Sequence, residues 1–381
     1  MRRMIFDTDH DDFRDMVRSF VATSVAPRVD EFIQAGAIAR DVWLSAGKLG
    51  LLGLHVPERY GGSDAPDYRF MAVVLEELSR VTVALGSAYS IHADIVAPYL
   101  LHLTTDEQRR RWLPGFCSGE MLTAIGMTEP SGGSDLAALR TRAVRDGDGW
   151  RLTGSKTFIT NGTTADLVVI AARTNPAERS RGITLFGVEA GTPGFTRGRR
   201  LDKVGQSEAD TAELYLEDAW VPDDNVIGAV DAGFPSMMAW LPQERLSAAV
   251  ANVAHAAQLL DETIAYVRDR RAFGQSIGSF QHNKFLIADL VTRVEATQAF
   301  VDQAVLAHVR GELTAVAAAK VKWWSAQVQN DVLDHCLQLH GGYGYMNEYR
   351  VGRAWRDARV TKIWAGSNEI MKEIIGRDLG L

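Results

Sequence analysis

Residues 126–162 read GMTEPSGGSDLAALRTRAVRDGDGWRLTGSKTFITNG, and this stretch decides how the rest of the chain is divided. Upstream, apolar residues recur at helical spacing, whereas here Gly, Ser, Thr, Asp and Pro interrupt short alternating runs that are typical of strands. The pattern predicts a loop, a strand, a hairpin and a second strand. The loop at 127–135 is rich in glycine and hydroxyl side chains, so its backbone N–H groups can face a polar or phosphate-bearing ligand. The alternative is a polar surface loop that leads into a strand.

The composition argues against several classes of function. The 381 residues include 41 basic and 48 acidic side chains, a formal net charge of −7, which gives no basic field for nucleic acid or for an anionic membrane surface. No apolar run is long enough for a spanning helix, and the first residues, MRRMIFDTDHDDF, lack the apolar core of a signal peptide. Two cysteines, Cys117 and Cys336, and scattered histidines predict neither a disulfide framework nor a metal site. We therefore expect a soluble, cytoplasmic protein.

Three domains are predicted along the chain. Residues 1–121 show helical periodicity, including a segment at 84–103 that is apolar nearly all round and is typical of a buried helix. Residues 122–229 contain most of the strand signals and predict a small β domain. Residues 230–381 return to long helical patterns, which predict a four-helix unit. The expected strands lie at 167–172, 184–188 and 212–216, and the expected C-terminal helices at 246–267, 281–308, 314–339 and 370–379.

The motifs MTEPSGGSD and GSKTFITNG resemble the flavin-facing signature of the acyl-CoA dehydrogenases, and the spacing between them also fits. The resemblance extends to HVPERYGGSD at 55–64, to LDKVGQSEADTAELYLEDAWVPDDNVIG at 201–228 and to C-terminal motifs, so it covers nearly the whole chain. It implies a mainly α fold of the α+β class, with an N-terminal helical domain, a central β-barrel-like domain and a C-terminal four-helix bundle. It also implies FAD and the α,β-dehydrogenation of an acyl-CoA to a trans-2-enoyl-CoA.

The base that this reaction needs is not at its usual place. Most of the family takes the α-proton with the Glu of an IYEGT motif, but this chain reads IWAGS at 363–367, and Ala365 cannot accept a proton. LPQERL at 241–246 resembles the long-chain and isovaleryl branch, whose base lies on that helix, and this match makes Glu244 the base. Pro242 suits a first helical turn, so we expect Glu244 near the positive end of the helix dipole, where a capping role is the alternative. Ala365 keeps the backbone N–H that, with a flavin hydroxyl, holds the thioester carbonyl in the family.

The resemblance assigns further residues to ligands. Ser134 and Arg245 match positions that contact the CoA moiety, although Arg245 could also form a surface ion pair. By family geometry Arg270, Gln281 and the run at 338–342 serve the flavin of a neighbouring subunit, so a homodimer is the smallest complete unit and a homotetramer, a dimer of dimers, is expected. The positions matched to flavin are Met127, Thr128, Phe158, Ile159, Thr160, Arg270, Phe273, Gln281, Gln338, Gly341, Gly342, Ser367 and Glu369.

Three interpretations of the function remain open. The first is a dehydrogenase that passes electrons to an electron-transfer flavoprotein. The second is a catalytically silent partner subunit of a heteromeric dehydrogenase, which Ala365 favours and Glu244 opposes. The third is an acyl-CoA oxidase, against which the compact length argues, because such oxidases usually carry an extra C-terminal helical domain. The length and branching of the acyl group, and the branch of lipid or amino-acid metabolism that supplies it, stay open.

Overall fold

The alternating runs in the middle of the chain form an eight-stranded sheet in the computed structural model, which describes residues 3–381. The order is β6-β7-β3-β2-β4-β5-β8, with β1 paired parallel to β4 and most other pairs antiparallel. The edge strands β6 and β8 are not neighbours in this order, so the predicted barrel-like domain is a sheet with two edges. The strands are β1 (Thr123–Gly126), β2 (Arg142–Asp146), β3 (Gly149–Thr160), β4 (Leu167–Arg173), β5 (Ile183–Glu189), β6 (Phe195–Arg200), β7 (Thr211–Pro222) and β8 (Val226–Ile227).

Helices precede the sheet, as the helical periodicity predicted. The apolar segment at 84–103 is helical but not one α-helix, because the π-helical turn η4 (Ile91–Val96) separates α5 from α6. This segment is buried along nearly its whole length. The N-terminal α-helices are α1 (Thr8–Phe20), α2 (Val29–Ala35), α3 (Arg40–Lys48), α4 (Tyr68–Val81), α5 (Val83–Ser90), α6 (Ala97–His102) and α7 (Asp106–Ser118).

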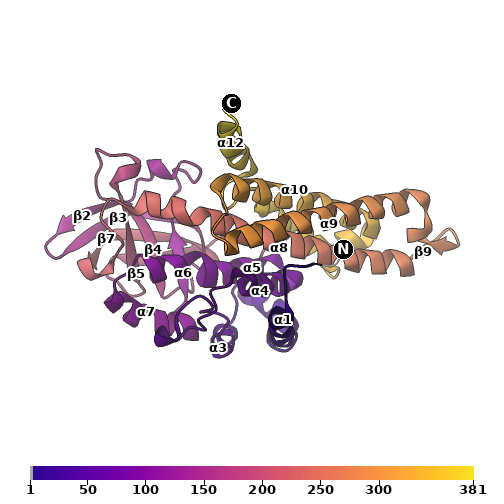
Figure 1. Cartoon of the computed structure of the whole chain (residues 1–381), viewed down its shortest axis with the longest axis horizontal. Coiled ribbons are helices and arrows are strands. Elements are labelled where there is room, and N and C mark those ends of the chain that lie inside the picture. Colours follow the sequence, from indigo (N-terminus) through magenta and orange to yellow (C-terminus); the bar gives the residue numbers. More distant parts are fainter. Residues whose placement is uncertain (1–2) are drawn as a thin grey trace.

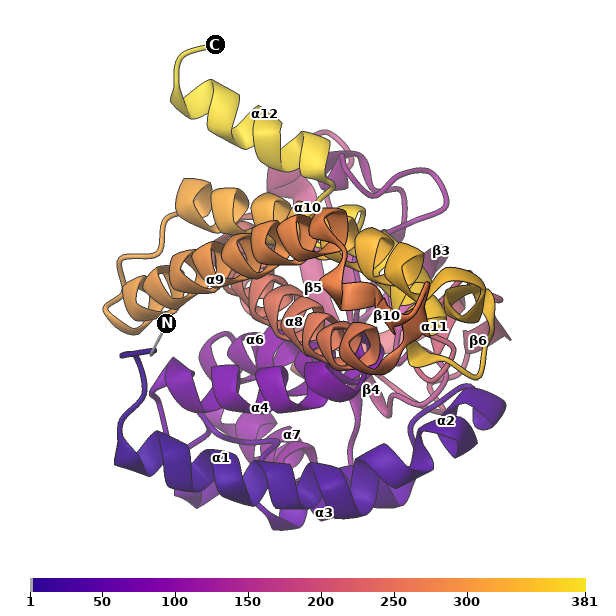
Figure 2. The same cartoon turned by 90° about the vertical axis from the view of Figure 1, so that its right-hand side faces the viewer.

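Long helices follow the sheet, and α8, α9 and α10 pack together, whereas the fourth helix of the predicted unit, α12, packs mainly on α10. The short, charged helix α11 was not predicted; it packs on α10, whereas α12, predicted at 370–379, contacts α10 and projects from the body (Figures 1 and 2). The elements are α8 (Gly233–Asp269), the hairpin β9 (Arg271–Ala272) and β10 (Gln275–Ser276), α9 (Gln281–Val309), α10 (Ala315–His340), α11 (Arg350–Ala358) and α12 (Asn368–Asp378).

The helix α8 connects the parts of the molecule. Its 37 residues span about 55 Å at the rise of an α-helix, from the side of the sheet to the hairpin β9–β10 at the opposite end (Figure 1). It packs against α4 of the N-terminal part, against α9 and α10, and against β5. One hydrophobic core therefore contains side chains from both helical domains. No helix within residues 3–381 is long and apolar enough to cross a membrane.

Candidate active site

The start of α8 differs from the prediction. The helix begins at Gly233, so Pro242 lies inside it and Glu244 lies about three turns from its beginning. The prediction that Pro242 marks the first turn, and that the helix dipole acts on Glu244, was therefore wrong. Pro235 occupies the first turn, where proline is tolerated because the N–H that it lacks has no helical partner there. Both Pro235 and Pro242 could mark the first turn of a helix in the sequence, and the structure uses Pro235.

A buried polar network fixes α8 on both sides of Glu244. Asp94, in η4, is fully buried and accepts hydrogen bonds from Gln243 Nε2 at 2.6 Å, from the Tyr68 hydroxyl at 2.9 Å and from Ser247 Oγ. Gln243 directly precedes Glu244 and Ser247 follows it by three residues. Because a proline inside a helix removes one backbone hydrogen bond, these side-chain bonds hold the helix where its own ladder is interrupted. Asp94 was not among the predicted site residues.

The surroundings of Glu244 favour its protonated form. Its side chain is partly buried, and burial raises its pKa to about 7, with the nearby carboxylate of Asp94 acting in the same direction. The cations of Arg245 and Lys322 act in the opposite direction without cancelling the effect. A carboxyl group with a pKa close to neutral pH can both take and return a proton, which is the property that general bases share.

The turn that contains Ala365 lies against α8 and α10. Ala365 has φ +51° and Gly366 φ +86°, so both occupy the left-handed region, which is uncommon for alanine. Lys322 Nζ, from α10, donates to the carbonyl of Gly366 at 2.7 Å. A Cβ on Gly366 would lie 2.5 Å from Met371 Cε and 3.9 Å from Arg245 Nη2. The fold thus brings the turn at 365–366 next to the residue that follows Glu244.

Arg245 is not a surface residue. Its side chain is buried, its Nε has no hydrogen-bond partner among residues 3–381, and burial lowers its pKa. This burial rules out the surface ion pair that the sequence left open. Lys322, also fully buried, was missed by the sequence analysis. The available signal was its helical spacing from the buried Ala318, Ala319 and Ser325, which places a lysine on an apolar face.

The two glycine-containing motifs of the sheet lie side by side. The N–H of Thr157 donates to the carbonyl of Thr128 at 3.0 Å, and Lys156 Nζ lies 2.8 Å from Glu129 Oε1 in a buried ion pair. Although burial opposes ionisation, Lys156 and backbone donors lower the pKa of Glu129 to about 2. The backbone N–H groups of Arg140 and Thr141 also donate to Glu129. These bonds fix the loop at 127–135 to β3.

A β-bulge in β3 turns Phe158 outward. The register with β7 shifts between Lys156 and Ile159, and Phe158 has φ +59°. Phe158 is 69% exposed, whereas Ile159 is buried, and bulges are common beside active sites because they redirect a side chain. Thr128 and Thr160 are partly exposed near this face. An open aromatic ring flanked by hydroxyl groups fits a planar, polar-edged ring such as isoalloxazine.

The remaining predicted flavin residues lie elsewhere. Arg270 stacks over the ring of Tyr343 at 5.3 Å, and a Cβ on Gly341 or Gly342 would meet nothing within 4 Å. Phe273 is 94% exposed. These residues, with the exposed Gln281 and Gln338, lie at the β9 end of the helices, away from the sheet (Figure 1). The α8 residues from Glu244 to Asp269 span about 37 Å, so the group beside β9 lies far from Glu244 within one chain.

Three other predicted residues occupy the surface or a helix start. Ser134 is exposed in the loop after β1. Ser367 caps α12, since its hydroxyl accepts a hydrogen bond from the N–H of Ile370 at 3.3 Å. Glu369 is exposed in the first turn of the same helix.

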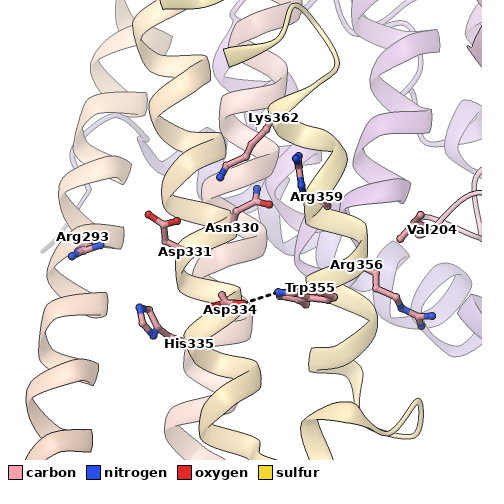
Figure 3. A pocket seen from close by; sticks show the side chains of 10 residues that line it. All are labelled: Val204, Arg293, Asn330, Asp331, Asp334, His335, Trp355, Arg356, Arg359 and Lys362. Carbon is pink, nitrogen blue, oxygen red and sulfur yellow. Dashed lines mark hydrogen bonds between the residues drawn. The ribbon is translucent and has the colours of Figure 1, made fainter. Parts of the chain in front are cut away.

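A surface hollow of about 400 Å³ does not coincide with any of these groups. It lies between α9, α10 and α11, and the Trp355 indole N–H donates to Asp334 across it at 3.1 Å (Figure 3). Its lining residues are Val204, Arg293, Asn330, Asp331, Asp334, His335, Trp355, Arg356, Arg359 and Lys362. None of them is a predicted site residue, so we place the candidate active site at Glu244 and the 365–366 turn.

Comparison with known proteins identifies the family. Models of the N-terminal, middle and C-terminal domains of acyl-CoA dehydrogenases match residues 7–120, 124–219 and 231–380. The long-chain specific acyl-CoA dehydrogenase of Sus scrofa is 43% identical, covering 99% of this chain and 88% of that protein. The isovaleryl-CoA dehydrogenase of Solanum tuberosum is 35% identical over 99% of this chain and 92% of its own. The crystal structure of an acyl-CoA dehydrogenase from Geobacillus kaustophilus superposes with a TM-score of 0.98 at 42% identity over the full length of both chains.

The chain therefore belongs to the acyl-CoA dehydrogenase family. It is an oxidoreductase that dehydrogenates acyl-CoAs. The resemblance to the long-chain and isovaleryl members, first seen in the sequence motifs, is confirmed by these similarities.

Proposed function

We propose that this chain is an FAD-dependent dehydrogenase in which Glu244 removes the α-proton of an acyl-CoA and the N–H of Ala365 holds the thioester carbonyl. The observation that supports this most is the convergence of two distant segments. Glu244 on α8 and the turn at 365–366 lie around the same buried cations, Arg245 and Lys322. A base and a carbonyl donor within one region are what proton abstraction next to a thioester requires.

The residues of the chain would act as follows. Bound FAD would supply the acceptor for the hydride that leaves Cβ. Glu244, with its pKa raised to about 7, would take the proton from Cα. As that proton leaves, negative charge collects on the carbonyl oxygen, and an N–H fixed in a turn stabilises it without reorganisation. The Asp94 network would keep the Glu244 side chain in position, because Asp94 hydrogen-bonds Gln243 and Ser247 on either side of it.

We also propose how the cofactor and the subunits are arranged. Thr128, Phe158 and Thr160 would contact the isoalloxazine ring. Arg270 and the exposed residues around β9 would contact the nucleotide part of the FAD in a second copy of the chain. The length of α8 supports this division, because about 37 Å of helix separate Glu244 from the residues beside β9. A homodimer would then be the functional minimum, and a homotetramer the expected assembly.

The proposal is tested by mixing FAD-loaded wild type or Glu244→Gln with a panel of saturated acyl-CoAs in the absence of oxygen. Reduction of the flavin is followed as the loss of its absorbance. We expect rapid bleaching in wild type and a bleaching rate lower by several orders of magnitude in the variant, because glutamine has the shape of glutamate but cannot accept the proton. Asp261→Asn, on an exposed position of α8, is the matched control and should bleach like wild type. Unchanged bleaching in Glu244→Gln would refute the assignment of the base. The panel would also rank acyl chain length and branching.

The electron acceptor is tested separately. We propose an electron-transfer flavoprotein as the acceptor rather than oxygen. Reduced enzyme should then reoxidise rapidly with that protein and slowly in aerated buffer, whereas fast oxygen consumption without added acceptor would favour an oxidase. If wild type binds FAD but no acyl-CoA bleaches it, the silent partner subunit becomes the better interpretation.

A further inference from the structure

Lys322 is a buried lysine without a role in the mechanism above, and burial lowers its pKa to about 7. Its side chain is fully buried in α10, and its Nζ donates to the carbonyl of Gly366 at 2.7 Å. Burying an ammonium group is costly unless it is paired, so a lysine at such a position requires a compensating interaction. The backbone carbonyl that it binds belongs to the turn next to Ala365.

That turn needs an external constraint. Ala365 lies in the left-handed region at φ +51°, which disfavours a residue with a Cβ, and it is followed by Gly366 at φ +86°. The methyl group of Ala365 cannot hydrogen-bond, so the side chain does not anchor the turn. The contacts that hold it are the Lys322 hydrogen bond, the packing of Met371 against Gly366 and the capping of α12 by Ser367.

We propose that Lys322 is a positioning residue that holds the turn at 365–366 in its left-handed conformation, so that the N–H of Ala365 is directed at the carbonyl oxygen of the acyl thioester. This inference rests on the proposed function of Ala365. Lys322 itself does not touch the substrate in this scheme. It fixes the Gly366 peptide, and without it Ala365 relaxes toward an ordinary backbone region and its N–H turns away from the substrate.

Loss of Lys322 should lower the reaction rate, because the N–H of Ala365 would no longer point at the carbonyl oxygen. A small displacement of a catalytic group lowers the rate by about 10–100-fold, because stabilisation of the transition state depends on alignment. The value of kcat should fall by this factor while KM for the acyl-CoA changes little. FAD content should stay at the level of wild type, since Lys322 is not among the residues assigned to the flavin.

A chromophoric acyl-CoA reports directly whether the N–H of Ala365 polarises its carbonyl. The CoA thioester of 4-dimethylaminocinnamic acid cannot be dehydrogenated, and its absorption moves to longer wavelength when its carbonyl is polarised. We would titrate it into the FAD-loaded wild type, Lys322→Met and Lys320→Met proteins. Lys320 is exposed two residues earlier on α10, so its variant controls for loss of a lysine from the helix. We expect a full shift in wild type and Lys320→Met, and a much smaller shift in Lys322→Met at saturating ligand.

The outcomes separate the two levels of the proposal. If the ligand binds to wild type without a shift, the proposed role of Ala365 fails. If wild type and Lys322→Met shift equally and have the same kcat, only the role of Lys322 is refuted. If the variant changes the pH dependence and keeps the shift, Lys322 acts through the charge of Glu244, which also refutes positioning. Should Lys322→Met not fold, Lys322→Gln decides the question, because its amide is too short to reach Gly366 and should lose the shift in the same way.

Discussion

Glu244 should make the folded protein less stable at alkaline pH. Burial raises its pKa from the usual 4.5 to about 7. Between these values the folded protein keeps a proton that the unfolded chain releases, so the free energy of unfolding decreases as pH rises through this interval. The full difference corresponds to about 3 kcal/mol and is reached above pH 7. Glutamine has the same shape and no charge, and therefore avoids this cost.

Thermal unfolding of FAD-loaded wild type and Glu244→Gln between pH 4.5 and 8 tests this relation. One kcal/mol shifts Tm by about 2–4 °C in domains of 150–250 residues and less in a longer chain, so we expect the variant to melt about 3–6 °C higher at pH 8. The two proteins should nearly coincide at pH 4.5, where Glu244 is protonated in both states. Asp261→Asn should follow wild type at every pH. A difference between wild type and Glu244→Gln that does not grow with pH would refute the reasoning.

Two further predictions concern Glu244 and its neighbour Asp94, and two concern buried charges elsewhere in the fold. The kcat/KM of wild type should rise with pH through about 7, as Glu244 ionises, in a pH–rate profile. Asp94→Asn should move that profile to lower pH, because it removes a nearby negative charge, and should lower kcat by about 10–100-fold in stopped-flow bleaching. Lys156→Met leaves Glu129 buried without its cation and should lower the free energy of unfolding by about 3–5 kcal/mol in denaturant titrations. Glu208 is fully buried and neither carboxylate oxygen makes a hydrogen bond within residues 3–381, although Lys203 and Arg350 lie near enough to interact electrostatically, so Glu208→Met should raise that free energy by about 1–3 kcal/mol.

Local patterns predicted the elements well where the pattern was strong. The strand expected at 167–172 is β4 (Leu167–Arg173), and the helix expected at 281–308 is α9 (Gln281–Val309). β4 is a short apolar run that is buried on both faces, and α9 repeats its buried residues at helical spacing, so the local pattern is sufficient to place both elements. The start of α8 was missed because two prolines compete for it, and the segment before Pro242 packs against α6 and the sheet through Met237.

The polar contacts of the candidate site could not be predicted in the same way. Asp94 lies in an apolar segment, and its partners Gln243 and Ser247 come from a helix that is distant in sequence. Lys322 similarly meets Gly366 only after α10 and α12 have packed. Motif similarity identified Glu244 and Ala365 as candidates, but the bonds that fix them depend on tertiary packing, which a single sequence does not state.

The packing of α4 against α8 has a consequence for synthesis on the ribosome. The apolar side of α4 is completed by the middle turns of α8, so the N-terminal helices cannot bury that side until this part of α8 has emerged. Roughly 170 residues separate the two, which corresponds to roughly 10–35 s at elongation rates of about 5–20 residues per second. During this interval the side of α4 that meets α8, which includes Tyr68 with its hydroxyl beside Ser247, stays uncovered on the nascent chain. Shielding of this side by a chaperone should therefore raise the yield of folded protein.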